Sequence, residues 1–282
     1  MAVTKQKVDR MHNEVRDNYR NAVQKEFLRT NKDLKGYLEF YTTMHYLRKH
    51  LPRGGLVLDA GSGPGRYTLE LARMGYNVVA LDPVEESLKF LERRARRLGL
   101  SGRIKSTVVG RLEDLGVFDS NEFDAIICIG GPLSHVMDPA LRKRSVSELL
   151  RVAKKGAPLF VGVMCRLASL KGFLNIFPHE VTTRYVKSYL ETGDYLWPHL
   201  YGFTHFHGFT PQELSAAFKG PRFRQLALVG LEGAGSYEKD SLKRLHRHKA
   251  RWNAWLRYHI MLAEQPSIIG SSEHILLVGK KV

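Results

Sequence analysis

Short apolar runs of strand length alternate along the chain with amphipathic runs of helical length. The runs that predict strands lie at residues 56–59, 77–81, 104–109, 123–129 and 157–164. Helical spacing occurs between them at residues 67–74, 85–98 and 141–152, and residues 111–119 predict a loop. Strands that alternate with helices are typical of a doubly wound α/β sheet. Two later runs, 223–231 and 274–279, complete a predicted seven-stranded Rossmann-like sheet.

Three segments fall outside this alternation. Residues 1–50 carry apolar side chains at helical spacing and predict a helical N-terminal extension to a main domain of residues 51–282. Within that domain, residues 166–210 form an aromatic-rich insertion after the fifth strand, too long for a simple connection. A basic segment, residues 238–262, predicts one helix between the last two strands.

The turn after the first predicted strand holds glycines at alternate positions. Gly61, Gly63 and Gly65 permit a positive φ and let a ligand approach bare backbone, and the helix that follows directs its free N–H groups to the same place. Asp82 ends the next strand, where an acid usually binds ribose hydroxyls. The pattern indicates a nucleoside-containing cofactor. Its spacing differs from the G-x-G-x-x-G of dinucleotide sites, and no lysine follows as in a P-loop.

The stretch Asp59-Ala60-Gly61-Ser62-Gly63-Pro64-Gly65 closely resembles the first motif of class I S-adenosylmethionine (SAM) dependent methyltransferases. The resemblance covers essentially the whole chain and implies a methyltransferase with SAM as cofactor, the loop near the amino-acid end of SAM and Asp82 at the ribose. At the adenine end, Arg111 replaces an acid that the family often has, and Leu112 is expected to cover the ring. The implied cofactor contacts are Asp59, Gly61, Gly63, Gly65, Asp82, Pro83, Arg111, Leu112 and Ile129.

The region after the fourth strand is expected to face the methyl acceptor, because ligands bind at the carboxyl ends of parallel strands. Segments 129–135, 207–214 and 272–279 resemble a group of archaeal and bacterial SAM methyltransferases that includes archaeal ribosomal RNA cytosine-N4 enzymes. Enzymes that methylate exocyclic amines of bases carry Asp/Asn/Ser-Pro-Pro-Tyr/Phe at this position. Here Gly130-Gly131-Pro132-Leu133 keeps the proline but lacks the polar first and aromatic fourth residues. The glycine carbonyls are expected to accept from an amine instead.

Histidines and aromatic residues supply further candidates. His135 follows the fourth strand, and an imidazole with an ordinary pKa near 6.5 can bind substrate or act as a base. An aromatic side chain of the insertion is expected to stack the methylated base. The catalytic candidates are Gly131, Pro132, His135 and His207, and the substrate-binding candidates in the insertion are Tyr201, His205 and Phe206. For each histidine a purely structural role is the alternative.

Composition adds one strong feature, a formal net charge of +16 from 44 Lys and Arg against 28 Asp and Glu. Proteins that bind polyanions need such an excess, since each cation–phosphate contact releases a counterion. The densest block lies in the basic segment, where Lys243, Arg244 and Arg247 are expected to bind RNA. The alternative is that these charges are solvated helix faces of a thermophilic protein, a reading that would suit an archaeal source.

Other features restrict the class of protein. No run of about 18 apolar residues predicts a membrane span, and the N-terminus lacks the apolar core of a signal peptide. Two cysteines suit a reducing cytoplasm and supply no metal site. Cys128 lies inside a strand and is expected to be a core residue rather than a nucleophile. The sequence leaves the oligomeric state open.

Our main hypothesis from sequence is a SAM-dependent methyltransferase acting on a base nitrogen of structured RNA, in particular the N4 amine of a cytosine in ribosomal RNA. The SAM motif, the net charge and the aromatic insertion motivate it. The alternative is a small-molecule N- or O-methyltransferase. A third class, a protein that binds SAM without catalysis, also stays open.

Overall fold

The computed structural model describes residues 5–196 and 204–282. Its centre is a seven-stranded sheet in the order β3-β2-β1-β4-β5-β9-β8. The strands are β1 (Leu56–Ala60), β2 (Asn77–Asp82), β3 (Ile104–Val109), β4 (Ala125–Cys128), β5 (Pro158–Met164), β8 (Phe223–Gly230) and β9 (His274–Lys281). The first five pair in parallel, and β9 runs antiparallel to β5 and β8. The predicted Rossmann-like sheet is confirmed.

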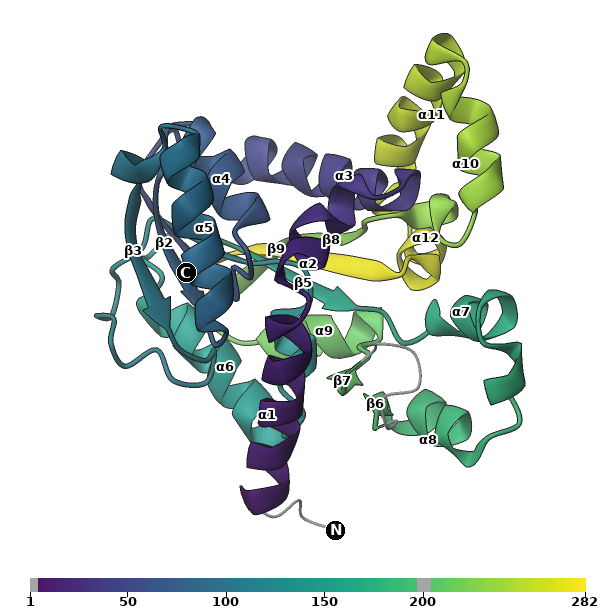
Figure 1. The fold of residues 1–282 in the computed structure, drawn as a ribbon, viewed down its shortest axis with the longest axis horizontal. Helices are drawn as coiled ribbons and strands as arrows, with labels where there is room; N and C mark the ends of the chain where they lie inside the picture. Colours follow the sequence, from purple (N-terminus) through teal and green to yellow (C-terminus); the bar gives the residue numbers. More distant parts are fainter. Residues whose placement is uncertain (1–4, 197–203) are drawn as a thin grey trace.

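Helices cover both faces of the sheet (Figure 1). They include α3 (Leu34–His50), α4 (Arg66–Arg73), α5 (Glu85–Arg97), α6 (Pro139–Val152) and α9 (Pro211–Phe218). Successive strand residues serve opposite faces: Leu58 packs in a core with Leu149 of α6, whereas Val57 packs with Leu47 of α3 and Leu71 of α4. Because helices bury both faces of the sheet, most residues of a central strand are apolar, and the strands appear in the sequence as continuous apolar runs.

The N-terminal extension consists of α1 (Lys5–Arg20), α2 (Val23–Leu28), a 3-10 turn (Arg29–Asn31) and α3. The side chain of Asp33 caps α3 by accepting from the backbone N–H of Gly36 at 2.9 Å. Since α3 packs directly on the sheet, it belongs to the core of the main domain. In contrast, α1 lies against the loops that follow the parallel strands.

The insertion after β5 contains α7 (Ser169–Asn175), a 3-10 turn (Pro178–Glu180), α8 (Arg184–Thr192) and a small hairpin of β6 (Asp194–Tyr195) and β7 (Phe206–His207). The hairpin strands pair antiparallel, Asp194 opposite His207. The insertion has its own apolar cluster, which includes Phe173, Tyr189 and Phe206. It therefore forms a packed lobe at the side of the sheet (Figure 1).

The basic segment differs from its sequence prediction. It forms two helices, α10 (Lys239–His246) and α11 (Lys249–Leu262), followed by a short α12 (Pro266–Ser271). The turn between α10 and α11 lets Leu242, Trp252 and Leu256 pack together on Leu38 of α3. One continuous helix would hold Leu242 and Leu256 about 21 Å apart, at 1.5 Å per residue.

No helix in the described ranges is long and apolar enough to cross a bilayer.

Candidate active site

A cavity of about 400 Å³ lies at the carboxyl ends of β1 to β4, beneath α1. The sheet side contributes the glycine loop, Asp82 and the residues after β3 and β4, and α1 contributes His12, Val15, Arg16 and Tyr19. These four residues lie on one face of the helix because they are three or four positions apart. The volume falls in the range of small-ligand pockets.

The glycine loop brings bare backbone to the cavity wall. Gly61 and Gly63 both line the cavity and have positive φ angles of 84° and 51°. A Cβ on Gly61 would clash with the ring of Pro132, whereas Gly63 faces open space. Gly65 lies outside the cavity: it begins α4, and a Cβ there would clash with Leu91 of α5. The first two glycines therefore allow ligand approach, and the third allows helix packing.

Asp82 lines the cavity beside this loop. Its carboxylate accepts hydrogen bonds from the backbone N–H groups of Gly63 at 2.7 Å and Val84 at 2.9 Å. Burial raises the pKa of Asp82 to about 6. The two N–H groups fix the carboxylate, and its remaining lone pairs can accept from neighbouring hydroxyls of a ligand.

Asp59, also predicted to contact the cofactor, does not line the cavity. It is buried beneath the loop, where it accepts a hydrogen bond from the hydroxyl of Thr68 on α4. Burial raises the pKa of Asp59 to about 7. Its position ties β1 to α4, so it shapes the loop from behind.

The other predicted cofactor residues, Pro83, Arg111, Leu112 and Ile129, all line the cavity. Leu112 supplies an apolar surface suited to a flat ring. The Arg111 side chain also makes a contact within the protein that was not predicted: its Nη1 donates to Nδ1 of His12 at 2.9 Å. Arg111 thus ties α1 to the loop after β3. Burial lowers the pKa of His12, which suits an imidazole that accepts this bond.

His135 stands at the end of the cavity that follows β4, beside Pro132. Its Nδ1 lies 2.9 Å from the backbone carbonyl of His205, an acceptor, so Nδ1 carries the proton. Nε2 is then the acceptor for the hydroxyl of Tyr19, 2.8 Å away. Burial lowers the pKa of His135 below its ordinary 6.5, so the ring is neutral at pH 7. Tyr19 was missed as a site residue in the sequence, although its spacing from His12, Val15 and Arg16 marks one face of α1.

The remaining catalytic and insertion candidates lie elsewhere. Gly131 begins the turn that carries His135 and does not line the cavity. His207 is buried outside the cavity with both ring nitrogens engaged, by Asp194 at 2.6 Å and Glu213 at 2.7 Å. Its predicted catalytic role therefore lacks support, because the ring lies outside the cavity and is held between two carboxylates.

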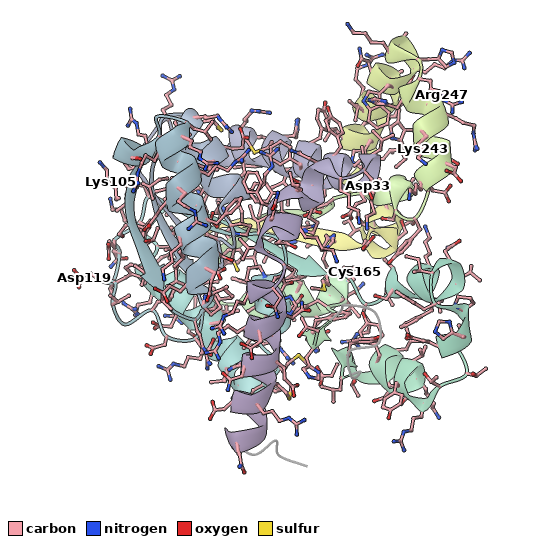
Figure 2. The ribbon with its side chains drawn as sticks, viewed as in Figure 1. Asp33, Lys105, Asp119, Cys165, Lys243 and Arg247 are labelled. Carbon is pink, nitrogen blue, oxygen red and sulfur yellow. The ribbon has the colours of Figure 1, made fainter. Side chains whose placement is uncertain are left out.

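The five described substrate-binding candidates also lie outside the cavity. His205 is bound by Glu14 of α1 at 2.6 Å, and Phe206 stacks on Tyr195 at 5.0 Å between ring centroids, inside the insertion. Tyr201 lies outside the described residues. The three basic candidates are Lys243 and Arg244 of α10 and Arg247 just after it. All three are exposed, and none lines the cavity. Figure 2 shows Lys243 and Arg247 at the far end of the molecule from α1.

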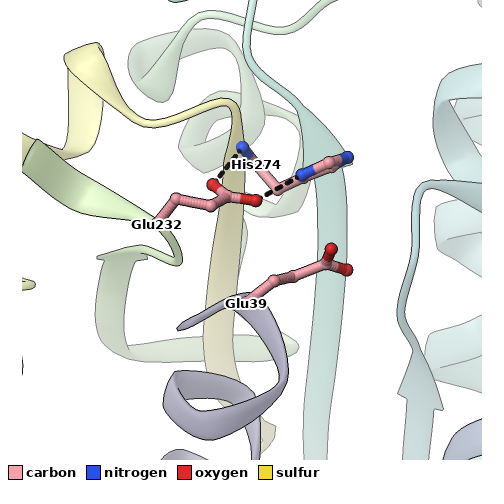
Figure 3. A group of neighbouring side chains, drawn as sticks. All are labelled: Glu39, Glu232 and His274. Carbon is pink, nitrogen blue, oxygen red and sulfur yellow. Dashed lines mark hydrogen bonds and ion pairs between the residues drawn. The ribbon is translucent and has the colours of Figure 1, made fainter. Parts of the chain in front are cut away.

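Glu39, Glu232 and His274 form a buried cluster whose ligand atoms lie within 4.8 Å of one another (Figure 3). His274 bonds Glu232 through Nδ1 at 2.6 Å. Although burial lowers the pKa of His274, the charge of Glu232 raises it to about 9, so the ring is protonated and offers no lone pair. Glu39 is held by both terminal nitrogens of Arg29, which lines the cavity. The cluster is an ion-pair network rather than a metal centre.

Comparison with known proteins identifies the domain. Residues 57–156 match the family described as "Methyltransferase domain". Two curated relatives are named ubiquinone biosynthesis O-methyltransferase. That of Hahella chejuensis is 33% identical over 150 residues, 53% of this chain and 58% of its own. That of Xylella fastidiosa is 37% identical over 125 residues, 44% of this chain and 48% of its own. The chain spans about half the length of the curated relatives it matches.

Two solved structures share the fold. A SAM-dependent methyltransferase of Methanosarcina mazei is 24% identical with a TM-score of 0.58, covering 84% of this chain and 97% of its own. A geranyl diphosphate C-methyltransferase of Streptomyces coelicolor, solved with S-adenosyl-L-homocysteine, is 18% identical with a TM-score of 0.53, covering 86% and 80%.

These findings correct the predicted partner. The curated relatives are named for the biosynthesis of ubiquinone, which is a small molecule. Their names contradict the prediction that the partner is RNA. They also give no support to a ribosomal RNA cytosine-N4 enzyme or to an archaeal, thermophilic source, since the relatives are bacterial. The family match, the fold and the cavity at the SAM motif agree on one identification. The chain has the Rossmann-like fold of class I SAM-dependent methyltransferases, and its residues 57–156 match the methyltransferase domain family.

Proposed function

We propose that the protein transfers the methyl group of SAM to a hydroxyl oxygen of a small molecule held in the cavity beneath α1. The observation that carries this proposal is the pairing of His135 Nε2 with a hydroxyl, that of Tyr19, inside the cavity. The names of the two curated relatives, both O-methyltransferases, support oxygen as the acceptor atom. The closure of the cavity by a helix favours a small acceptor.

The donor half of the cavity fits SAM. When bound, SAM supplies an electrophilic methyl group on a positively charged sulfur. Gly61 and Gly63 line the cavity without side chains, so their backbone would receive its amino-acid end. Asp82, fixed by two N–H groups, would accept from the ribose hydroxyls. Leu112 would cover the adenine ring.

The acceptor half fits a hydroxyl nucleophile. Methyl transfer is an in-line displacement, so most of the rate comes from holding the acceptor oxygen in line and excluding water. His135 is neutral at pH 7, and the carbonyl of His205 keeps the proton on Nδ1. Nε2 is therefore ready to take the proton of a hydroxyl. An acceptor that displaced the Tyr19 hydroxyl would place its own oxygen at this nitrogen.

A nitrogen acceptor is the second candidate within the same proposal. A neutral amine attacks with its own lone pair and sheds a proton afterwards, so it does not need a base before the transfer. Gly130 lines the cavity, and its carbonyl would accept from such an amine. A variant of His135 separates the two cases, because only a hydroxyl acceptor depends strongly on the unprotonated Nε2 as a base.

The test is methyl transfer from labelled SAM to a small-molecule extract and, in parallel, to total RNA. We expect label in the small-molecule pool and an O-methyl group in the product by mass spectrometry. His135→Gln should abolish most of the transfer, while His248→Gln, an exposed control, should not. Label in RNA alone would refute a small-molecule acceptor, and SAM binding without transfer to either pool would indicate a protein that does not catalyse methylation.

A further inference from the structure

Helix α7 presents an exposed aliphatic surface to solvent. Leu170 and Leu174 are four positions apart on one face of α7, Leu167 lies in the turn before the helix, Ile176 caps its end, and Val181 follows the next 3-10 turn. The relative exposure of these five residues ranges from 51% to 73%. We call them the aliphatic patch. Soluble proteins rarely gather large exposed aliphatic side chains in one short segment unless something covers them.

The fold of the insertion does not require the aliphatic patch. The opposite face of α7 packs inward through Phe173, which contacts Tyr189 of α8 in a T-shaped ring pair at 6.1 Å between centroids. Val186 and Phe206 complete that apolar cluster. The leucines on the outer face therefore leave the packing of the lobe unchanged and are available to an external partner.

A strongly basic hairpin, α10 and α11, adjoins the patch. Tyr237, two residues before α10, abuts α7: a Cβ added to Gly172 would lie 2.8 Å from its hydroxyl. A Cβ added to Gly270 of α12 would lie 3.8 Å from Leu167, within van der Waals contact. Figures 1 and 2 show α7 and α10 on the same side of the molecule. Residues 237–257 hold two acids, Glu238 and Asp240, and seven exposed cations: Lys239, Lys243, Arg244, Arg247, Lys249, Arg251 and Arg257.

The exposed face of α11 also carries apolar side chains. Tyr258, Met261 and Leu262 share this face with Arg251, which lies seven positions before Tyr258. Trp255 is half-buried on the same side. Aromatic and aliphatic residues mixed with cations on a helix are typical of a surface that lies in the headgroup region of a bilayer.

The combination of charge and aliphatic surface selects the partner. A nucleic acid would bind the cations but leave the leucines exposed to water. A second copy of the chain would bring two basic hairpins together. An anionic bilayer satisfies both features, because headgroups attract the cations and the acyl boundary receives the aliphatic side chains. We propose that the aliphatic patch of α7 and the α10–α11 hairpin dock the protein on the surface of an anionic lipid bilayer.

The test is co-sedimentation of the full chain with vesicles of phosphatidylcholine, with or without phosphatidylglycerol. We expect binding only when phosphatidylglycerol is present, weakened by salt. Leu170→Ser with Leu174→Ser should weaken binding by about tenfold or more, since each substitution removes an exposed leucine that the bilayer would bury. Reversal of Lys243, Arg244 and Arg247 to Glu should weaken it comparably.

Two controls match these changes in kind. Leu98→Ser with Val117→Ser removes exposed apolar residues far from α7, and reversal of Arg93, Arg96 and Arg97 on α5 changes the same number of charges. Both should retain vesicle binding. Three results would overturn the proposal: no binding to anionic vesicles, binding that the leucine variants retain in full, or a dimer in sedimentation that those variants abolish. Circular dichroism establishes that each variant is folded.

Discussion

The ion pair of Glu232 and His274 leads to a sharp prediction on stability. Glu232 is fully buried and accepts from the hydroxyl of Ser272, the backbone N–H of His274 at 2.8 Å and the His274 ring at 2.6 Å. Burial raises the pKa of Glu232, but the charge and hydrogen bonds of His274 outweigh it and lower that pKa to about 2. The pair lies where the N-terminal extension meets β9, beside Glu39 of α3 (Figure 3). Replacing His274 by Gln removes the positive charge and leaves Glu232 buried.

The magnitude follows from the pKa of His274. That pKa rises from an ordinary 6.5 to about 9 in the folded protein. Each pKa unit corresponds to about 1.4 kcal/mol, so protonation of His274 stabilises the fold by roughly 3 kcal/mol. Because the folded pKa is the higher one, this contribution is present in full below pH 6.5 and is lost as the pH rises through 9.

The assay is urea unfolding of the wild-type protein and of His274→Gln at several pH values from 6 to about 9.5. The free energy lost in the variant should be greater at pH 6 than at pH 9.5 by roughly 3 kcal/mol. Comparing the two proteins at each pH removes the titration of groups whose pKa the substitution leaves unchanged. His248→Gln, at an exposed position, should show no such dependence. An equal loss in His274→Gln at all pH values would refute a protonated His274 in the fold.

Three further predictions concern the site. His135→Gln should lower kcat by about 100-fold or more without changing the Kd of SAM in calorimetry. The wild-type rate should persist as the pH falls through 6.5 and decline only below it, because burial lowers the pKa of the base; a decline centred above 6.5 would contradict a neutral buried imidazole. Asp82→Ala should raise the Kd of SAM by about 10- to 100-fold in a folded protein, and an unchanged Kd would exclude it from ribose binding. Cys128→Ala should leave kcat unchanged, because burial raises the pKa of this thiol to about 12; loss of transfer with the fold intact would point to covalent chemistry.

The donor half of the site could be predicted because its signals are local in sequence. Gly61 and Gly63 lie in the turn that they shape, and Asp82 ends the strand adjacent to β1, so one βαβ unit places all three together. The strands could be predicted for the same reason, since each is marked by a run of apolar residues that are adjacent in the sequence. Asp59 shows the limit of the motif: residue type and spacing do not distinguish a side chain that faces the ligand from one that supports the loop from behind.

The acceptor half could not be predicted with the same success because it depends on contacts between distant segments. Tyr19 and His135 are 116 residues apart and meet only after α1 packs across the strand ends. His207 has the same residue type and a similar aromatic neighbourhood, yet Asp194 and Glu213 enclose it. The basic segment fails as one helix for a related reason, since packing on Leu38 of α3 favours a turn between α10 and α11.

The prediction of RNA as the methyl acceptor is wrong because the net charge of a protein does not identify the acceptor in its active site. Net charge is a sum over the whole chain. In this fold the cations of α10 lie outside the cavity, whereas residues of α1 line it. A base in a folded RNA would have to pass that helix, whereas a small acceptor needs only the space beside His135 and Tyr19. The excess of charge and the exposed leucines of α7 then require an explanation separate from the chemistry. Docking on an anionic bilayer would give both a role without placing either at the methyl group, so loss of docking should leave methylation of a water-soluble acceptor unchanged.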